Sequence, residues 1–395
     1  MFFYGKTLIL EGFVTLDVVL DRITWPNYLE TPRMATLDQL LTALQTVIDP
    51  NTGKDFVTTK ALKNLTVTDG DVAFDVTLGY PAASQIPALR KALIAAAKTV
   101  AGVDNVSCNV TSKIVSHAAQ RGVALLPTVK NIVAVASGKG GVGKSTTAVN
   151  LALALAAEGA RVGLLDADIY GPSQPMMMGI NGKPSSEDGK SMEPMENYGV
   201  QVMSIGFLVA QDEAMIWRGP MATQALEQLL RQTNWKDLDY LIVDMPPGTG
   251  DIQLTLSQKV PLTGAVIVTT PQDIALLDAK KGIKMFEKVG VPILGIVENM
   301  AVHVCTNCGH TEHIFGVDGG KKMASEYGMD YLGALPLDMQ IRVQADGGKP
   351  TVAADPDGKV SQIYKDIARQ LAIKIAAKAK DFSAKFPTIT VSKDT

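Results

Sequence analysis

The sequence predicts an α/β fold in which a mainly parallel sheet is covered by helices on both faces, preceded by a small α+β domain. Three observations predict it. From about residue 130 onward, short apolar runs alternate with helical patterns, which is typical of a parallel sheet between helices. Before that point, two alternating runs are joined by Asp69-Gly70, a strong signal for a β-hairpin. The length of 395 residues also exceeds that of one ordinary domain.

Within the small domain, apolar residues at helical spacing run from Leu40 to Val47, and Asp49-Pro50 ends that helix. The hairpin is followed by a helix from about 86 to 100 and a strand from about 106 to 114. In the larger domain we expect strands at 132–136, 162–166, 200–205, 240–244, 265–269, 293–298 and 331–334, and helices at 145–157, 221–232 and 274–288. Ligands of such sheets bind beyond the carboxyl ends of the strands.

We expect five segments: an extension over 1–34, the small α+β domain over 35–116, a linker over 117–129, the larger domain over 130–380, and a tail over 381–395. The extension is interpreted as preceding the natural start, because Met34 opens the segment MATLDQLL. The alternative is an extra strand or helix docked on the next domain.

The composition excludes several classes of protein. Apolar residues make up 46% and charged residues 19%, so a large core can form. The net charge of −3 argues against binding nucleic acid through bulk positive charge. Three cysteines are too few for a disulfide framework and fit a reducing compartment, so we expect a cytoplasmic protein. No apolar run reaches the ~18 residues that span a bilayer.

The segment SGKGGVGKSTT, residues 137–147, follows the expected strand at 132–136 and opens a helix. Gly138, Gly143, Lys144 and Ser145 fit the pattern G-x-x-x-x-G-K-[ST]. Glycines let backbone N–H groups turn toward phosphate oxygens, and the helix adds its positive end. Lys144 can reach the β- and γ-phosphates, and the Ser145 hydroxyl can bind Mg²⁺. The sequence therefore predicts a P-loop NTPase, with the nucleotide held by Gly138, Lys139, Gly140, Gly141, Val142, Gly143, Lys144, Ser145 and Thr146.

Carboxylates stand at two further strand ends. Asp166 and Asp168 follow the strand at 162–165, where a carboxylate can position the attacking water. Asp244 ends the strand at 240–244 and can hold Mg²⁺ through water. Asp251 lies in the next loop and either senses the γ-phosphate or caps a helix over 252–256.

Cys305 and Cys308 form a C-x-x-C pair, whose spacing lets two thiolates hold one metal centre. A thiolate-bound cluster usually needs four cysteines, and two copies of this pair on a dimer axis supply them. The sequence thus predicts a cluster that bridges two subunits. The alternatives are a single-chain zinc site with His310 and His313, a redox disulfide, or a structural pair. Cys108 alternates with apolar residues on a strand and is interpreted as a small buried hydrophobe.

A second lysine, Lys139, follows the first glycine of the loop. With it, the loop resembles the deviant P-loop family that includes MinD, ParA, the nitrogenase iron protein and the Mrp/ApbC proteins. The resemblance implies that Lys139 reaches the nucleotide of the partner subunit and that Asp168 positions the attacking water. It places Asp166 near Mg²⁺, Asn299 against the adenine, and Pro336 in the turn that lines the base. The preference for ATP rests on this resemblance.

The order of GKGGVGKST, DADIYGPS, DMPPGTGD, ENM and C-x-x-C-G-H over about 130–345 resembles the Mrp/ApbC branch, the bacterial iron–sulfur cluster carriers. This resemblance implies a homodimeric, slow ATPase that binds a [4Fe–4S] cluster between subunits. Its expected partners are a cluster assembly scaffold and the apoproteins that receive the cluster. The domain over 35–116 resembles the small iron–sulfur assembly domain of many such proteins, which often carries a cysteine after its hairpin. Here that loop reads GYPAASQ, residues 79–85, so we interpret the domain as a docking or accessory module.

A rival function comes from the C-terminal helix. Ile363, Ile367, Leu371 and Ile375 fall four apart among basic residues, as in the membrane helix of MinD-type positioning ATPases. We expect instead that this stripe packs on the larger domain and that the protein has no stable association with membranes. A transferase or synthetase on the same P-loop would need a substrate pocket, for which the sequence has no signature. Residues 174–198 are expected to form a mobile loop on the side that faces a partner.

Overall fold

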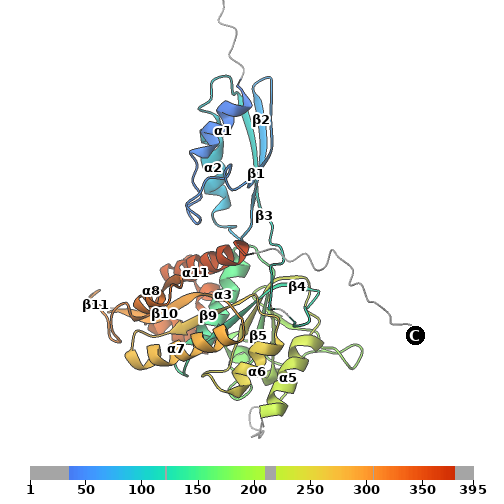
Figure 1. Ribbon diagram of the computed structural model, residues 1–395, viewed down its shortest axis with the longest axis vertical. Coiled ribbons are helices and arrows are strands. Elements are labelled where there is room, and N and C mark those ends of the chain that lie inside the picture. Colours follow the sequence, from blue (N-terminus) through green and yellow to red (C-terminus); the bar gives the residue numbers. More distant parts are fainter. Residues whose placement is uncertain (1–34, 121, 210–218, 306, 379–395) are drawn as a thin grey trace, which may run out of the picture.

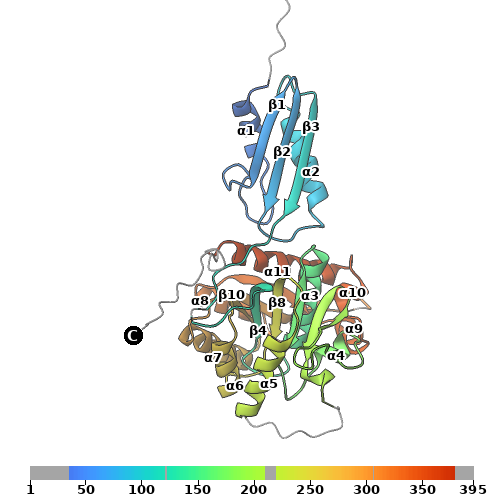
Figure 2. The same ribbon diagram turned by 90° about the vertical axis from the view of Figure 1, so that its right-hand side faces the viewer.

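The computed structural model of the chain describes residues 35–120, 122–209, 219–305 and 307–378. The extension expected over 1–34 and the tail expected over 381–395 lie outside the described residues. Two bodies are stacked along the longest axis, a small sheet with helices on one face and a larger sheet between layers of helices (Figures 1 and 2).

The small domain is a three-stranded sheet in the order β1-β2-β3. Its predicted hairpin is confirmed, because β1 and β2 pair antiparallel across Asp69 and Gly70, which both have positive φ. β3 then pairs parallel to β2. The core-facing side chains of β2 alternate with outward ones, so the helices cover one face only. The elements are α1 (Leu37–Gln45), β1 (Leu62–Thr68), β2 (Asp71–Leu78), α2 (Ile86–Ala97) and β3 (Asn105–Ser112).

The larger domain contains the predicted parallel sheet, in the order β11-β10-β9-β4-β8-β5-β7-β6, with β12 beside β10. Only the short strands β6 and β11 pair antiparallel. Helices α3 and α11 pack together on one face, while α5, α6 and α7 cover the other. The strands are β4 (Val129–Ala136), β5 (Val162–Asp166), β6 (Met195–Asn197), β7 (Val200–Ser204), β8 (Leu238–Asp244), β9 (Gly264–Thr269), β10 (Ile293–Val304), β11 (Thr311–Glu312) and β12 (Tyr331–Pro336). The helices are α3 (Lys144–Ala157), α4 (Gln174–Met177), the 3-10 turn η1 (Ile205–Phe207), α5 (Gly219–Gln232), α6 (Asp251–Lys259), α7 (Asp273–Lys288), α8 (Gly319–Glu326), α9 (Met339–Asp346), α10 (Thr351–Ala354) and α11 (Lys359–Ala376).

The expectation of a mobile loop over residues 174–198 is wrong in part. The segment contains α4, and it ends in β6, which forms an edge of the sheet. Tyr198 and Gly199 both have positive φ, so they make the two-residue turn that folds β6 back onto β7.

The apolar stripe of α11 is covered within the chain. Ile367, Leu371 and Ile375 are buried, and the helix packs against α3 and β12. This confirms that the stripe is the core-facing side of the last described helix. Across the parts of the chain that the structure describes, no helix combines the length and apolar character that a membrane crossing requires.

The two domains meet at the far end of α3. Glu158 directly follows that helix, and its carboxylate accepts hydrogen bonds from the N–H and hydroxyl of Ser84 at 3.0 and 2.6 Å. Arg369 of α11 forms an ion pair with the same carboxylate. The N–H of Ala83 donates to the Glu158 carbonyl at 3.1 Å. The loop at 79–85, which contains no cysteine, therefore contacts the larger domain through Ala83 and Ser84.

Candidate functional site

The phosphate loop lies where β4 ends and α3 begins. Gly141 and Gly143 have φ values of +82° and +79°, in the left-handed region that favours glycine. Gly143 is the cap residue of α3, whose first residue is Lys144. A Cβ on Gly143 would lie 2.1 Å from Nδ2 of Asn299, so both the backbone and the available space require glycine here.

Neighbouring elements fix the rest of the loop. A Cβ on Gly138 would lie 2.1 Å from the carbonyl carbon of Asp278 in α7, so the loop packs directly on that helix. Val142 is buried, and Lys139 is half-buried while its carbonyl accepts from the Ser137 hydroxyl at 2.8 Å. The other predicted loop residues follow the same path, with Gly140 exposed and Ser145 and Thr146 half-buried in the first turn of α3.

Lys144 is the cation at the centre of the site. Its side chain is only 6% exposed and forms an ion pair with the fully buried Asp244, while Nζ also lies 3.0 Å from Oγ of Ser145. Because β8 is the sheet neighbour of β4, with Asp244 opposite Val135, the strand order brings this carboxylate to the loop. A lysine, a hydroxyl and a strand-end carboxylate are the groups that bind nucleotide phosphates and Mg²⁺.

Asp166 lies opposite Asp244 on the adjacent strand β5 and is fully buried. Its carboxylate accepts from the N–H groups of Ser173 and Gln174 at 3.0 and 3.1 Å and from the Ser204 hydroxyl at 3.0 Å. Burial, followed by the nearby Asp244 charge, raises the pKa of Asp166. These contacts hold the loop after β5 against the sheet, which is a positioning role that its sequence pattern does not reveal.

Gln174 is a site residue that the sequence analysis missed. It begins α4, is fully buried, and donates through Nε2 to the Asp244 carboxylate at 2.8 Å and to the Ser145 carbonyl at 3.1 Å. It therefore connects the strand-end aspartate with the phosphate loop. The only signal for it in the sequence is its place directly after the DADIYGPS run.

The remaining predicted residues differ in how far they are buried. Asp168 is half-buried, and its burial raises its pKa while the charge of Lys144 acts in the opposite direction. Asp251 is exposed and is the first residue of α6, so the alternative in which it caps that helix is wrong; Gly250 occupies the cap position. Pro336 ends β12, beside β10, and pairs with Val302.

Asn299 connects the phosphate loop to β10. Its side chain is buried and donates to the Val142 carbonyl at 2.9 Å. The strand runs on for five residues to Val304, which is longer than the sequence predicts, and Cys305 follows directly. The same element therefore joins the nucleotide site to the cysteine pair, with an irregularity at Met300, where φ is +55° and the register with β12 shifts.

The cysteine pair lies in the turn between β10 and β11. The N–H of Cys305 donates to the His310 carbonyl, and the N–H of Gly309 donates to the Cys305 carbonyl, both at 2.8 Å. Cys305 is half-buried and Cys308 is exposed. Hydrogen bonds from the backbone N–H groups of Cys308 and Asn307 lower the pKa of the Cys305 thiol. The hairpin therefore presents two thiols at the surface, one of them prepared to ionise.

The histidines near this hairpin face other groups. His303 and His313 each place Nδ1 near a backbone carbonyl, of Leu337 at 3.0 Å and of Ala301 at 2.8 Å. His310 is exposed beside Glu312. Within 35–120, 122–209, 219–305 and 307–378, no three histidine, cysteine or acidic side chains gather closely enough to hold a metal ion. His303 and His313 are thus each engaged with a backbone carbonyl through one ring nitrogen, while His310 is exposed on the hairpin.

A buried strand, a glycine loop and a helix, with a lysine paired to the aspartate of the next strand, define a P-loop nucleotide-binding protein. Two family models match the chain. The one described as NUBPL iron-transfer P-loop NTPase covers residues 128–372, and the one described as iron–sulfur cluster assembly protein covers residues 37–108. The chain belongs to the NUBPL iron-transfer P-loop NTPase family and is an ATPase. The predicted fold class and the resemblance to cluster carriers are confirmed.

Two similar proteins are described as iron–sulfur cluster carrier proteins. The chain is 61% identical over 269 residues to an iron–sulfur cluster carrier protein of Pseudomonas fragi, covering 68% of this chain and 94% of that one. It is 51% identical over 329 residues to an iron–sulfur cluster carrier protein of Escherichia coli K12, and the match covers 83% of this chain and 88% of that one. Among solved structures, a nucleotide-binding protein from Archaeoglobus fulgidus in complex with ADP is 38% identical, with a TM-score of 0.50 and coverage of 56% and 88%.

Proposed function

We propose that this protein is a homodimeric carrier that holds a [4Fe–4S] cluster on Cys305 and Cys308 of both subunits and transfers it to apoproteins, with ATP binding and hydrolysis controlling the transfer. The observation that carries the proposal is the surface hairpin itself. It presents two thiols, and among the described residues no group of three histidine, cysteine or acidic side chains gathers closely enough to hold a metal ion. Four thiolates are the usual requirement of such a cluster, so a second copy of the hairpin completes the set.

The surroundings of the hairpin favour contact with another molecule. Val304, Ile314 and Val317 are each about half exposed, although they are apolar. Leu277 of α7 and Val317 line one groove of about 550 Å³. Exposed apolar side chains on the segments that flank the cysteine turn are suited to a face that another subunit or an acceptor covers.

Nucleotide binding would change the ion-pair partner of Lys144. Lys144 pairs with Asp244 in this structure, and an incoming triphosphate would draw its ammonium toward the β- and γ-phosphates. Ser145 and Asp244 would hold a magnesium ion, whose charge stabilises the phosphates. Asp168 would position the attacking water, and Lys139 of each subunit would reach the nucleotide of the other. Asn299 and Pro336 are assigned to the base.

Strand β10 is the proposed route from ATP to the cluster. Asn299 contacts the phosphate loop, and Cys305 lies six residues further along the chain, beyond an irregularity at Met300, whose φ is +55°. A shift of Val142 when phosphates bind would move Asn299 and, through the strand, the hairpin. Nucleotide state would thus change the distance between the two thiol pairs on the dimer axis.

Anaerobic reconstitution with iron and sulfide tests the proposal, followed by iron, sulfide and zinc analysis and by light scattering for mass. The expected product is a dimer with four irons. Cys305→Ser and Cys308→Ser should each abolish cluster uptake and leave ATP binding intact. Cys108→Ser is the matched control, because Cys108 is buried in the small domain. Transfer is then followed to an apo iron–sulfur enzyme, with and without ATP.

Two results would contradict the bridging cluster. One is full iron uptake by the Cys305→Ser protein. The other is a chain that remains monomeric under every nucleotide and metal condition. Equal cluster transfer by the Lys144→Ala protein would leave the bridging cluster unaffected. It would contradict the control of transfer by ATP.

A further inference from the structure

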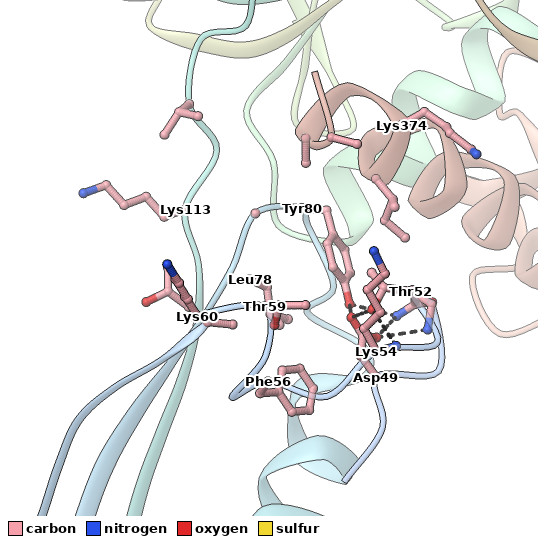
Figure 3. A pocket seen from close by; sticks show the side chains of 18 of the residues that line it. Asp49, Thr52, Lys54, Phe56, Thr59, Lys60, Leu78, Tyr80, Lys113 and Lys374 are labelled. Carbon is pink, nitrogen blue, oxygen red and sulfur yellow. Dashed lines mark hydrogen bonds between the residues drawn. The ribbon is translucent and has the colours of Figure 1, made fainter. Parts of the chain in front are cut away.

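A cavity of about 670 Å³ lies at the joint between the two domains, within the size range of about 300–1,000 Å³ typical of ligand sites. One wall comes from the small domain, including the stretch from Asp49 to Lys63 and the end of β2. The opposite wall is α11, from Gln370 to Ala377. Figure 3 draws side chains of both walls, with Lys54 on the small-domain wall extending toward α11. None of the lining residues belongs to the phosphate loop or the cysteine hairpin.

The cavity concentrates positive charge in a chain whose net charge is −3. Its lining includes five lysines and one aspartate. Lys374 is paired with Asp330 at 2.6 Å, whereas the four others have no ion-pair partner among the described residues. All four are exposed and stand on the small-domain wall: Lys54, Lys60, Lys63 and Lys113.

The single aspartate does not neutralise them. Asp49 is 4% exposed, and its carboxylate accepts from the N–H of Asn51 at 3.0 Å, the Thr52 hydroxyl at 2.9 Å and the Tyr80 hydroxyl at 2.7 Å (Figure 3). It is used to shape the wall of the cavity. Asp49 therefore forms no ion pair with the four lysines, which are free to contact the anionic groups of a ligand.

The floor of the cavity is apolar. Phe56 and Leu78 are buried beneath it, and Ile373 and Ala376 contribute from α11. A rim of exposed lysines over an apolar floor matches a chain segment that carries several carboxylates and an apolar side chain between them. A small inorganic polyanion would bind lysines as well, but it has no apolar part that the floor could contact.

We propose that this interdomain cavity binds an acidic segment of a partner protein, with the carboxylates of the segment on Lys54, Lys60, Lys63 and Lys113 and an apolar side chain on the floor. The segment would contact the small domain and α11 at once. Because the cavity is at the end of α3 opposite the phosphate loop, this docking is separate from nucleotide binding and from the thiol pair. It gives the small domain a recruiting role that needs no cysteine.

The test uses the full chain saturated with Mg²⁺-ADP, so that the phosphate loop is filled, and a fluorescein-labelled peptide of alternating glutamate and leucine. Binding is measured by fluorescence anisotropy. Lys60→Glu with Lys113→Glu should weaken binding at least about tenfold, because two attractions become repulsions. The matched control is Lys91→Glu with Lys98→Glu, two exposed lysines on and just after α2 with the same change of charge. Control binding should stay within about twofold of the wild type.

Further measurements separate the proposal from its rivals. Lys54→Glu with Lys63→Glu should repeat the loss, and raising the salt should weaken wild-type binding, since exposed charges are screened. Circular dichroism of every variant establishes that it is folded. Equal losses in the cavity and control variants, or no binding by the wild type, would overturn the proposal. So would displacement of the peptide by inorganic tripolyphosphate as effectively as by unlabelled peptide, which would assign the cavity to a small polyanion.

Discussion

The joint between the domains allows a quantitative prediction. Arg369 and Glu158 are 4% and 1% exposed, and Arg369→Met removes the cation while leaving the carboxylate buried. Breaking a buried ion pair in this way costs about 3–5 kcal/mol. The two hydrogen bonds that Glu158 keeps from Ser84 place the expected cost at the lower end, about 3 kcal/mol. With a urea m-value of about 3 kcal/mol/M for a domain of this size, the unfolding midpoint should fall by about 1 M.

The assay is urea unfolding of the full chain, followed by fluorescence of the buried Trp235 in the larger domain and by far-UV circular dichroism. Arg161→Met is the control, because the Arg161 side chain is about half exposed and the buried Asp239, which it contacts, keeps its ion pair with Lys130, so the cost should be less than about 1 kcal/mol. Arg369→Met combined with Glu158→Gln should recover part of the lost free energy of unfolding, because no unpaired charge of this ion pair remains buried. If Arg369→Met destabilised the protein no more than the control, or if the double variant were the sum of both single ones, the reasoning would be refuted.

Three further predictions concern the two candidate sites. Lys144→Ala should weaken ATP binding at least about a hundredfold, measured with a fluorescent nucleotide, and retention of wild-type affinity would exclude the assigned role. Gly143→Ala should lose nucleotide binding as well, because its φ is +79° and its Cβ would meet Asn299; an unchanged affinity by the same titration would contradict the loop geometry. The lowered pKa of Cys305 means that its thiolate forms at lower pH, so alkylation by iodoacetamide, followed by mass spectrometry, should level off below the ordinary thiol range. Burial raises the pKa of Cys108 to about 11, so this thiol should react slowly up to high pH, and equal rates at pH 7 for both would be the contrary result.

The position of the small domain gives its loop at 79–85, which contains no cysteine, a structural role. The loop at 79–85 is engaged with Glu158, which directly follows the helix that begins at Lys144. That helix of 14 residues is about 21 Å long, so nucleotide and interdomain contacts stand at its two ends. Removal of the Glu158 contact is therefore expected to free the small domain without disturbing the phosphate loop.

The sequence alone determined those features that depend on neighbouring residues along the chain. Local backbone conformation is indicated directly by glycine and turn residues. This predicted the glycine loop, the helix after it and the hairpin at Asp69-Gly70. The buried stripe of α11 follows from helical spacing. The carboxylates at strand ends were found because parallel strands deliver their ends to one edge of the sheet.

Only the tertiary structure decided the features that depend on residues far apart in the sequence. The contact of Gln174 with Asp244 spans 70 positions, and the ion pair of Arg369 with Glu158 spans 211. The contacts of His303 and His313 with the carbonyls of Leu337 and Ala301 likewise depend on which carbonyls lie nearby after folding. The lysine-lined cavity exists because packing places a small-domain wall opposite α11, and local residue preferences carry no information about such a placement.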